Sequence, residues 1–193
     1  MSIISNTTIQ NLTIAIWETK ETLEELLQLS NEKTIPNFNT EKRKKEWLAS
    51  RLLLNEINPN YSISYNTFGA PELNDDSYIS ISHSKRLVAI IVSQQKVGID
   101  IEEISEKALK VSSKFISTNN FKLLTAEKAT LIWCAKEAIY KLYQKGNLNF
   151  IKDIKIPDFK ISEKGILKAE FKTELLILNY QKIHSHYLVY VCK

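Results

Sequence analysis

The chain has 193 residues, of which 44% are apolar and 25% are charged, a composition that supports a packed core and excludes a disordered protein. Its net charge of +4 is too small to require a nucleic-acid partner, although it is compatible with an acidic protein or a phosphorylated ligand. The sequence has no signal-peptide pattern and no apolar run of membrane-spanning length, and its two cysteines do not have metal-ligand spacing. We therefore expect a cytoplasmic protein that binds neither membrane nor nucleic acid.

The first half of the chain predicts helices and short strands. Residues 12–18 (LTIAIWE) predict an opening strand, and residues 20–33 predict a first helix. Thr40 is suited to be the N-cap of a second helix over residues 41–57, which carries the basic run EKRKKEWLASR. Residues 77–104 predict three short strands separated by polar breaks.

In the second half, as in the first, a helix is followed by strands. Residues 125–146 place apolar side chains along one helical face and end at Gly146, a natural C-cap. Residues 160–193 predict an antiparallel meander. The two halves end on similar phrases, SHSKRLVAIIVS and IHSHYLVYVC, which hints at two related lobes with a site between them.

One predicted strand, residues 97–103 (VGIDIEE), combines aliphatic and acidic residues. Because side chains alternate along a strand, Gly98, Asp100 and Glu102 share one face, and the aliphatic residues between them face the core. Gly98 leaves room for something to approach the backbone closely, and we expect that to be a ligand. Two interpretations of the carboxylates stay open: they are solvated at the end of a half-exposed strand, or they belong to a site.

The helix over residues 125–146 carries a second candidate group. Trp133, Glu137 and Lys141 follow at successive turns and face away from its apolar stripe. A Glu four residues before a Lys is ordinarily a surface pair worth about 0.3 kcal/mol, but the tryptophan indicates that this face is covered, by the other lobe or by a ligand. If Asp100, Glu102 and Glu137 converge, they form an oxygen site suited to Mg²⁺.

Cations and small hydrogen-bond donors precede these residues. Lys44 and Arg51 share a helix face, and Ser82 and His83 lie where a strand emerges, so that the four could bind a phosphate. The alternatives are a solvated helix face and a histidine with ordinary strand contacts. A nucleic-acid module built on residues 42–51 is a further alternative, but no aromatic stacking platform accompanies the basic run.

The phrases SHS, VGIDIE and WCAKEAIYK, in this order, resemble the 4'-phosphopantetheinyl transferases of the larger, single-chain type. The resemblance implies an α+β fold, a pseudo-dimer of two similar α+β lobes with the active site between them. We place the lobes at residues 1–96, which would grip the 3'-phosphate of coenzyme A, and 97–193, which would carry the metal-binding strand and helix. The signature positions present are Gly98, Asp100, Glu102, Trp133, Lys136, Glu137, Ala138 and Lys141.

The resemblance implies Mg²⁺-dependent transfer of the 4'-phosphopantetheine arm of coenzyme A to a serine of an apo acyl or peptidyl carrier protein, which releases adenosine 3',5'-bisphosphate. Asp100, Glu102 and Glu137 would hold Mg²⁺. Glu137 or a metal-bound water would accept the serine proton, Lys141 would balance phosphate charge, and the chain would act as a monomer. The residues expected to bind coenzyme A are Lys44, Arg51, Ser82, His83, Asp100 and Lys141.

Two positions depart from the family pattern. Ala70 stands in Gly69-Ala70-Pro71 where the family usually has lysine, and Asn120 stands where an acid is common. These departures keep a second hypothesis open, a non-catalytic module that binds coenzyme A or a carrier protein.

Overall fold

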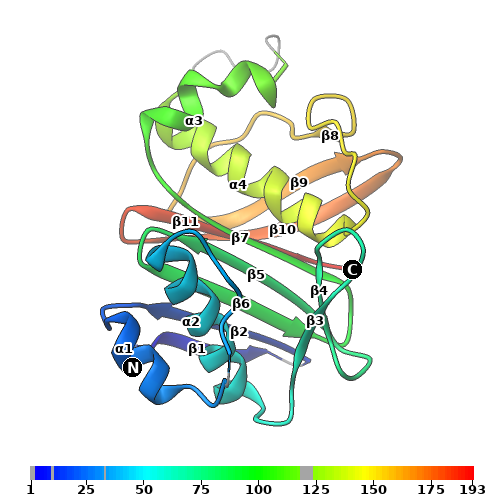
Figure 1. The fold of residues 1–193 in the computed structure, drawn as a ribbon. Helices are drawn as coiled ribbons and strands as arrows, with labels where there is room; N and C mark the ends of the chain where they lie inside the picture. The colour runs from blue at the N-terminus through cyan, green and yellow to red at the C-terminus, as the bar shows by residue number, and fades with distance from the viewer. Residues whose placement is uncertain (1–2, 10, 33, 118–123) are drawn as a thin grey trace. The chain divides into compact units, whose positions relative to one another are not determined.

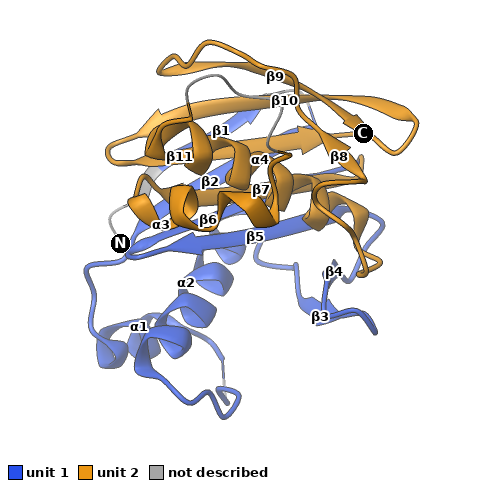
Figure 2. Ribbon diagram, turned by 90° about the horizontal axis from the view of Figure 1, so that it is seen from above, with its two compact units in different colours: residues 1–94 blue, residues 95–193 orange. Residues whose placement is uncertain are grey.

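The computed structural model describes residues 3–9, 11–32, 34–117 and 124–193. The chain forms two compact units, Met1–Gln94 and Gln95–Lys193, which are coloured separately in Figure 2. Each unit combines an antiparallel sheet with helices, and this confirms the α+β class. Within the described ranges, no helix is both long enough and apolar enough to cross a bilayer. The pseudo-dimer and the roles assigned to the two lobes stay predictions.

The first unit contains a four-stranded antiparallel sheet, a small hairpin and two helices (Figure 1). Its elements are β1 (Ile3–Ile9), β2 (Leu12–Glu18), α1 (Leu23–Leu29), α2 (Glu41–Ile57), β3 (Ile63–Tyr65), β4 (Pro71–Leu73), β5 (Tyr78–Ser84) and β6 (Leu87–Ser93). The strand order in the large sheet is β1-β2-β6-β5, and β3 pairs with β4. The sequence did not predict β1, the edge strand that pairs with β2.

Helix α2 supplies the basic run of the first unit and covers its sheet. Thr40 is the N-cap, as predicted, because its Oγ1 accepts a hydrogen bond of 3.2 Å from the Arg43 backbone N–H. The buried side of α2, which includes Leu48 and Leu53, belongs to a core with Trp17 of β2 and Ile90 of β6. This packing leaves the charged side of α2 for the contacts described below.

The second unit contains a five-stranded antiparallel sheet covered by a long helix. Its elements are β7 (Val97–Glu103), α3 (Glu106–Lys110), the 3₁₀ turn η1 (Ser112–Lys114), α4 (Ala126–Tyr143), β8 (Ile154–Lys155), β9 (Lys164–Phe171), β10 (Glu174–Ile183) and β11 (His186–Cys192). The order is β7-β11-β10-β9-β8, so the predicted meander is confirmed. The sequence did not predict that β7 would join it by pairing with β11, with Asp100 opposite Val189.

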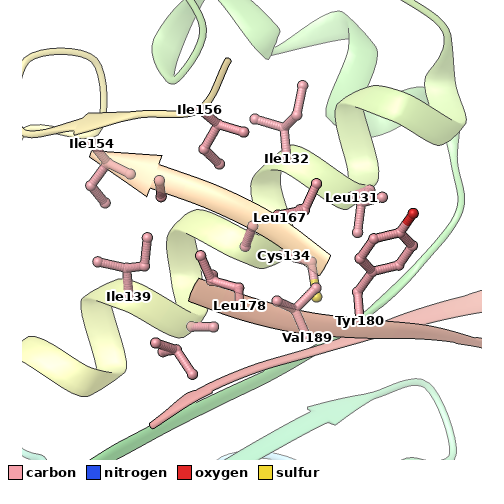
Figure 3. Close-up of a cluster of buried hydrophobic side chains, with 14 of the residues drawn as sticks. Leu131, Ile132, Cys134, Ile139, Ile154, Ile156, Leu167, Leu178, Tyr180 and Val189 are labelled. Carbon is pink, nitrogen blue, oxygen red and sulfur yellow. The ribbon is translucent and has the colours of Figure 1, made fainter. Parts of the chain in front are cut away.

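Helix α4 packs its apolar face on this sheet. The positions predicted to form that face are all buried, and Figure 3 shows Leu131, Ile132 and Ile139 gathered with side chains of the strands. The predicted C-cap was wrong: the helix ends at Tyr143, and Gln144 takes the left-handed conformation with φ 58°. The sequence therefore predicted which side of α4 is buried more accurately than where α4 ends.

Candidate functional site

Helix α4 and strand β7 approach each other closely at Gly98. A Cβ atom at this position would lie 2.0 Å from the Ala138 carbonyl oxygen and 2.7 Å from the Leu142 backbone nitrogen. Those distances are far shorter than van der Waals contact, so only glycine permits this packing. The expectation that Gly98 clears space for a ligand was wrong, because the backbone of α4 fills that space.

This close packing brings side chains of α4 to the carboxylates of β7. Asp100 is buried, with 3% of its surface exposed, and its Oδ1 accepts a hydrogen bond of 2.7 Å from Lys141 Nζ. A buried carboxylate requires such a partner, because an unpaired charge in the protein interior is costly. The interpretation that Asp100 is a solvated strand residue is therefore wrong.

Glu102 has an aromatic partner on the same helix. Trp133 donates its Nε1–H to Glu102 Oε1 across 3.0 Å. The indole ring packs against Phe115 and Phe150, with ring centroids 5.0 and 5.5 Å away. Two aromatic rings of the same unit therefore cover Trp133, which the sequence did not predict; cover by the other lobe or by a ligand stays a prediction.

Glu137 has the most perturbed carboxyl of the group. Burial, followed by the negative charge of Asp100, raises its pKa to about 7, and Glu102 adds to the effect while Lys141 opposes it. The pKa of Glu102 is also raised, first by burial and then by Asp100. The predicted carboxyl groups therefore lie close enough to influence one another's ionisation.

These interactions do not establish a metal site. Over the parts of the chain that the structure describes, no group of three or more His, Cys, Asp or Glu side chains is placed to hold a metal ion. Asp100 instead has the Lys141 ammonium at Oδ1. Coordination of a metal by Asp100, Glu102 and Glu137 stays a prediction.

A cavity of about 630 Å³ opens beside Glu102. Trp133 and Phe150 give it aromatic walls, and Lys107 and Lys114 place positive charge along it. A lining that mixes apolar rings with charged groups is suited to a ligand segment with both polar and apolar parts.

Lys136 is a buried residue of α4 that was named as a signature position but given no role. Only 4% of its surface is exposed, and its Nζ donates hydrogen bonds to the backbone carbonyls of Phe150 and Ile154. Burial lowers the pKa of Lys136 to about 8. A signal was present in the sequence: Lys136 lies one turn from both Ile132 and Ile139, at the edge of the apolar stripe.

In the first unit, Arg51 is held by several contacts. Its guanidinium carbon lies 3.6 Å from the centroid of the Trp47 ring, and its Nη2 donates to the Tyr65 hydroxyl at 3.4 Å. Glu32 lies 3.6 Å from Arg51 Nε. A cation stacked in this way has a fixed orientation, so Arg51 is more than a solvated charge on a helix face.

His83 lies on β5 beside two charged residues of α2. Its Nδ1 is 3.2 Å from Glu46 Oε1, and its Nε2 contacts Arg43 Nη1. The Glu46 side chain is buried and lies 3.3 Å from Arg43 as well. The sequence indicated His83 as a site residue but not Glu46, because the five charged residues before Glu46 gave no sign that it is buried.

The other predicted residues are less informative. Ser82 is buried with 4% exposure, and Lys44 is half-buried on α2. Ala70 follows a turn in which Asn66 Oδ1 accepts its backbone N–H at 3.0 Å. Asn120 lies outside the described residues.

Comparisons with known proteins agree with the sequence motifs. A family model for the 4'-phosphopantetheinyl transferase superfamily matches residues 96–192, which include all of β7 and α4. Two similar proteins are a 4'-phosphopantetheinyl transferase gsp of Aneurinibacillus migulanus, 32% identical over 111 residues, and an enterobactin synthase component D of Salmonella typhi, 30% identical over 114 residues.

These alignments cover part of each protein. The first covers 52% of this chain and 47% of the relative, and the second covers 53% and 49%. The chain therefore spans about half the length of the curated relatives it matches. The family model nevertheless extends over half of the chain and includes both signature motifs, so the resemblance is confirmed and the chain belongs to the 4'-phosphopantetheinyl transferase superfamily.

Proposed function

We propose that this chain transfers the 4'-phosphopantetheine arm of coenzyme A to a serine of an apo acyl or peptidyl carrier protein, with Mg²⁺, and releases adenosine 3',5'-bisphosphate. The observation that carries the proposal is the charge group formed by β7 and α4. Within it, Lys141 pairs with the buried Asp100, and Glu102 and Glu137 have raised pKa values. Carboxyl groups with perturbed pKa values are typical of functional sites.

The chemistry of the donor atoms suits a hard divalent cation, although the described side chains are not placed to hold one. Asp100, Glu102 and Glu137 offer only carboxylate oxygens, which Mg²⁺ prefers, and their mutual repulsion would be relieved by positive charge. Mg²⁺ bound by these residues would neutralise the pyrophosphate of coenzyme A. The single positive charge of Lys141 offsets only part of the repulsion among these three carboxylates.

The side chains provide the remaining chemistry. Glu137, whose pKa is raised to about 7 in the absence of a metal ion, or a metal-bound water would accept the proton of the incoming serine. Lys141 would balance charge on the transferred phosphate. Phosphoryl transfer depends mainly on positioning and charge stabilisation, so the reaction needs no protein nucleophile.

Residues of the first unit would bind coenzyme A. Arg51, oriented by its stacking on Trp47, is suited to form two parallel hydrogen bonds with the 3'-phosphate. Lys44, Ser82 and His83 are the other proposed contacts. The cytoplasmic location and the monomeric state also stay predictions.

The test is a mass measurement. Purified protein with Mg²⁺ and coenzyme A should add the mass of phosphopantetheine to at least one member of a panel of apo carrier proteins. Glu137→Gln should abolish this gain, whereas Glu106→Gln, a change at an exposed position of α3, should preserve it. Calorimetry with coenzyme A separates the alternatives. Binding of coenzyme A without any mass gain supports the non-catalytic module, whereas neither binding nor mass gain would contradict both functions.

A further inference from the structure

Lys136 connects helix α4 to the segment that follows it. Its buried ammonium donates to the backbone carbonyls of Phe150 and Ile154, the second at 2.6 Å. Ile154 begins β8, whereas Phe150 lies in the irregular stretch before it. One side chain of the helix therefore holds two points of a segment that has little regular structure of its own.

The segment also has internal hydrogen bonds that do not involve Lys136. Asp153 Oδ2 accepts the Asn149 backbone N–H at 2.8 Å. Asn149 Oδ1 accepts the backbone N–H groups of Ile151 and Lys152 at 3.1 and 3.0 Å. These bonds define the shape of the turn, but they do not attach it to α4. Lys136 supplies an attachment.

The attached segment contacts Trp133, and through it Glu102, by way of the Phe150 ring. The Phe150 ring lies 5.5 Å from the Trp133 ring and 6.0 Å from the Tyr140 ring. Trp133 in turn donates to Glu102, and Phe150, Trp133 and Glu102 all line the same cavity. A shift of Phe150 would therefore remove support from the indole that orients Glu102.

We infer that Lys136 is a positioning residue, which fixes Phe150 against Trp133 and thereby holds Glu102 in place at one side of the cavity. Its effect on transfer rests on the proposed function, but its effect on Trp133 does not. An apolar side chain at position 136 would fill the same space and leave two carbonyl groups without their donor.

Fluorine NMR of protein labelled with 5-fluorotryptophan tests this inference. The chain has three tryptophans, so the spectrum contains few signals, and Trp133→Phe assigns the one of interest. In Lys136→Met, we expect the Trp133 resonance to shift or broaden while those of Trp17 and Trp47 stay in place. Lys152→Met, a change at an exposed lysine of the same segment, is the matched control and should leave all three unchanged.

The outcomes are distinct. A folded Lys136→Met protein with an unaltered Trp133 resonance overturns the inference. If that variant does not fold, the wild-type protein provides the test. Scalar couplings across the hydrogen bonds from Lys136 Nζ to the carbonyl carbons of Phe150 and Ile154 should be observed, and their absence overturns the inference.

The transfer assay provides a second readout. Lys136→Met should reduce kcat/KM by up to about 100-fold, the loss expected when a catalytic group is displaced by about 1 Å. If Trp133 responds while the wild-type protein transfers nothing, the proposed function fails and the positioning role stands. If transfer is normal in Lys136→Met, the effect on Glu102 is refuted.

Discussion

The Lys141 ammonium donates a hydrogen bond to Asp100 Oδ1 across 2.7 Å and so connects the last turn of α4 to the middle of β7. The charge of Lys141 lowers the pKa values of Glu102 and Glu137, and the charge of Asp100 raises both. The ionisation of each glutamate therefore depends on how the Asp100–Lys141 pair is arranged.

The first prediction concerns the titration of Glu137. Without divalent ions, its carboxyl should titrate near pH 7. Lys141→Met should move the midpoint upward because a favourable charge is lost, and Asp100→Asn should move it downward because a repulsive charge is lost. Carbon NMR of protein labelled at glutamate carboxyls, recorded in EDTA, measures the midpoint. Lys145→Met, at an exposed position, should have no effect, and an unchanged midpoint in Lys141→Met would contradict the coupling.

The second prediction concerns stability. The pKa of Glu137 is raised from 4.5 to about 7 in the folded protein, so the folded state binds this proton more tightly than the unfolded state does. Unfolding free energy is therefore lost as pH rises from about 4.5 to 7, by about 1 to 3 kcal/mol. Glu137→Gln should remove this loss and be more stable than wild type at pH 8, but not at pH 4.

Urea unfolding in EDTA at several pH values measures this effect. Glu106→Gln is the control, because Glu106 is exposed, and it should keep the wild-type dependence on pH. A Glu137→Gln protein whose stability falls over the same pH range as strongly as that of wild type would show that another group is responsible.

The third prediction concerns Gly98. Gly98→Ala places a methyl group 2.0 Å from the Ala138 carbonyl oxygen, so α4 must move, and we expect a loss of about 3 kcal/mol in unfolding free energy. Gly165→Ala is the comparison, since its methyl group would meet the end of the Tyr180 side chain at 2.9 Å, which can move more easily than a helix backbone. Equal losses in the two variants would contradict the proposed role of Gly98.

The sequence predicted local features where a single element decides them. Thr40 was a correct N-cap because capping depends on the residues of one turn. The prediction of the buried face of α4 was correct because helical periodicity fixes which side chains share a side. Such features need no knowledge of what lies opposite.

Sequence patterns did not predict the contacts of residues whose partners are distant along the chain. Gly98 signalled a close approach, but the pattern could not show that α4 makes it. Glu46 is buried by its contacts with His83 and Arg43, although the five residues before it are charged. Lys136 was named as a signature position but given no role, because its carbonyl partners lie in a turn without a recognisable motif.

The fourth prediction tests the hydrogen bond from Trp133 to Glu102. Trp133→Phe keeps an aromatic ring but removes the N–H, so the pKa of Glu102, which this bond lowers, should rise. Under the proposed function, affinity for a divalent ion should fall by about 10- to 100-fold, as is common when a partner of a metal ligand is removed. Mn²⁺ binding followed by electron paramagnetic resonance measures this, with Trp47→Phe as the control in the other unit. Unchanged Mn²⁺ affinity would exclude Glu102 as an oriented ligand.

The fifth prediction separates the contribution of Arg51 to 3'-phosphate binding from its contribution to structure. The guanidinium stacks on Trp47 and reaches Tyr65, a geometry that lysine cannot reproduce because its ammonium is a point charge. Arg51→Lys should therefore weaken binding of coenzyme A by about 10-fold, the equivalent of about 1.4 kcal/mol, and leave binding of dephospho-coenzyme A unchanged. Calorimetry with both ligands gives the four affinities. If the variant loses affinity equally for the two ligands, Arg51 does not bind the 3'-phosphate, and the loss reflects the altered packing against Trp47.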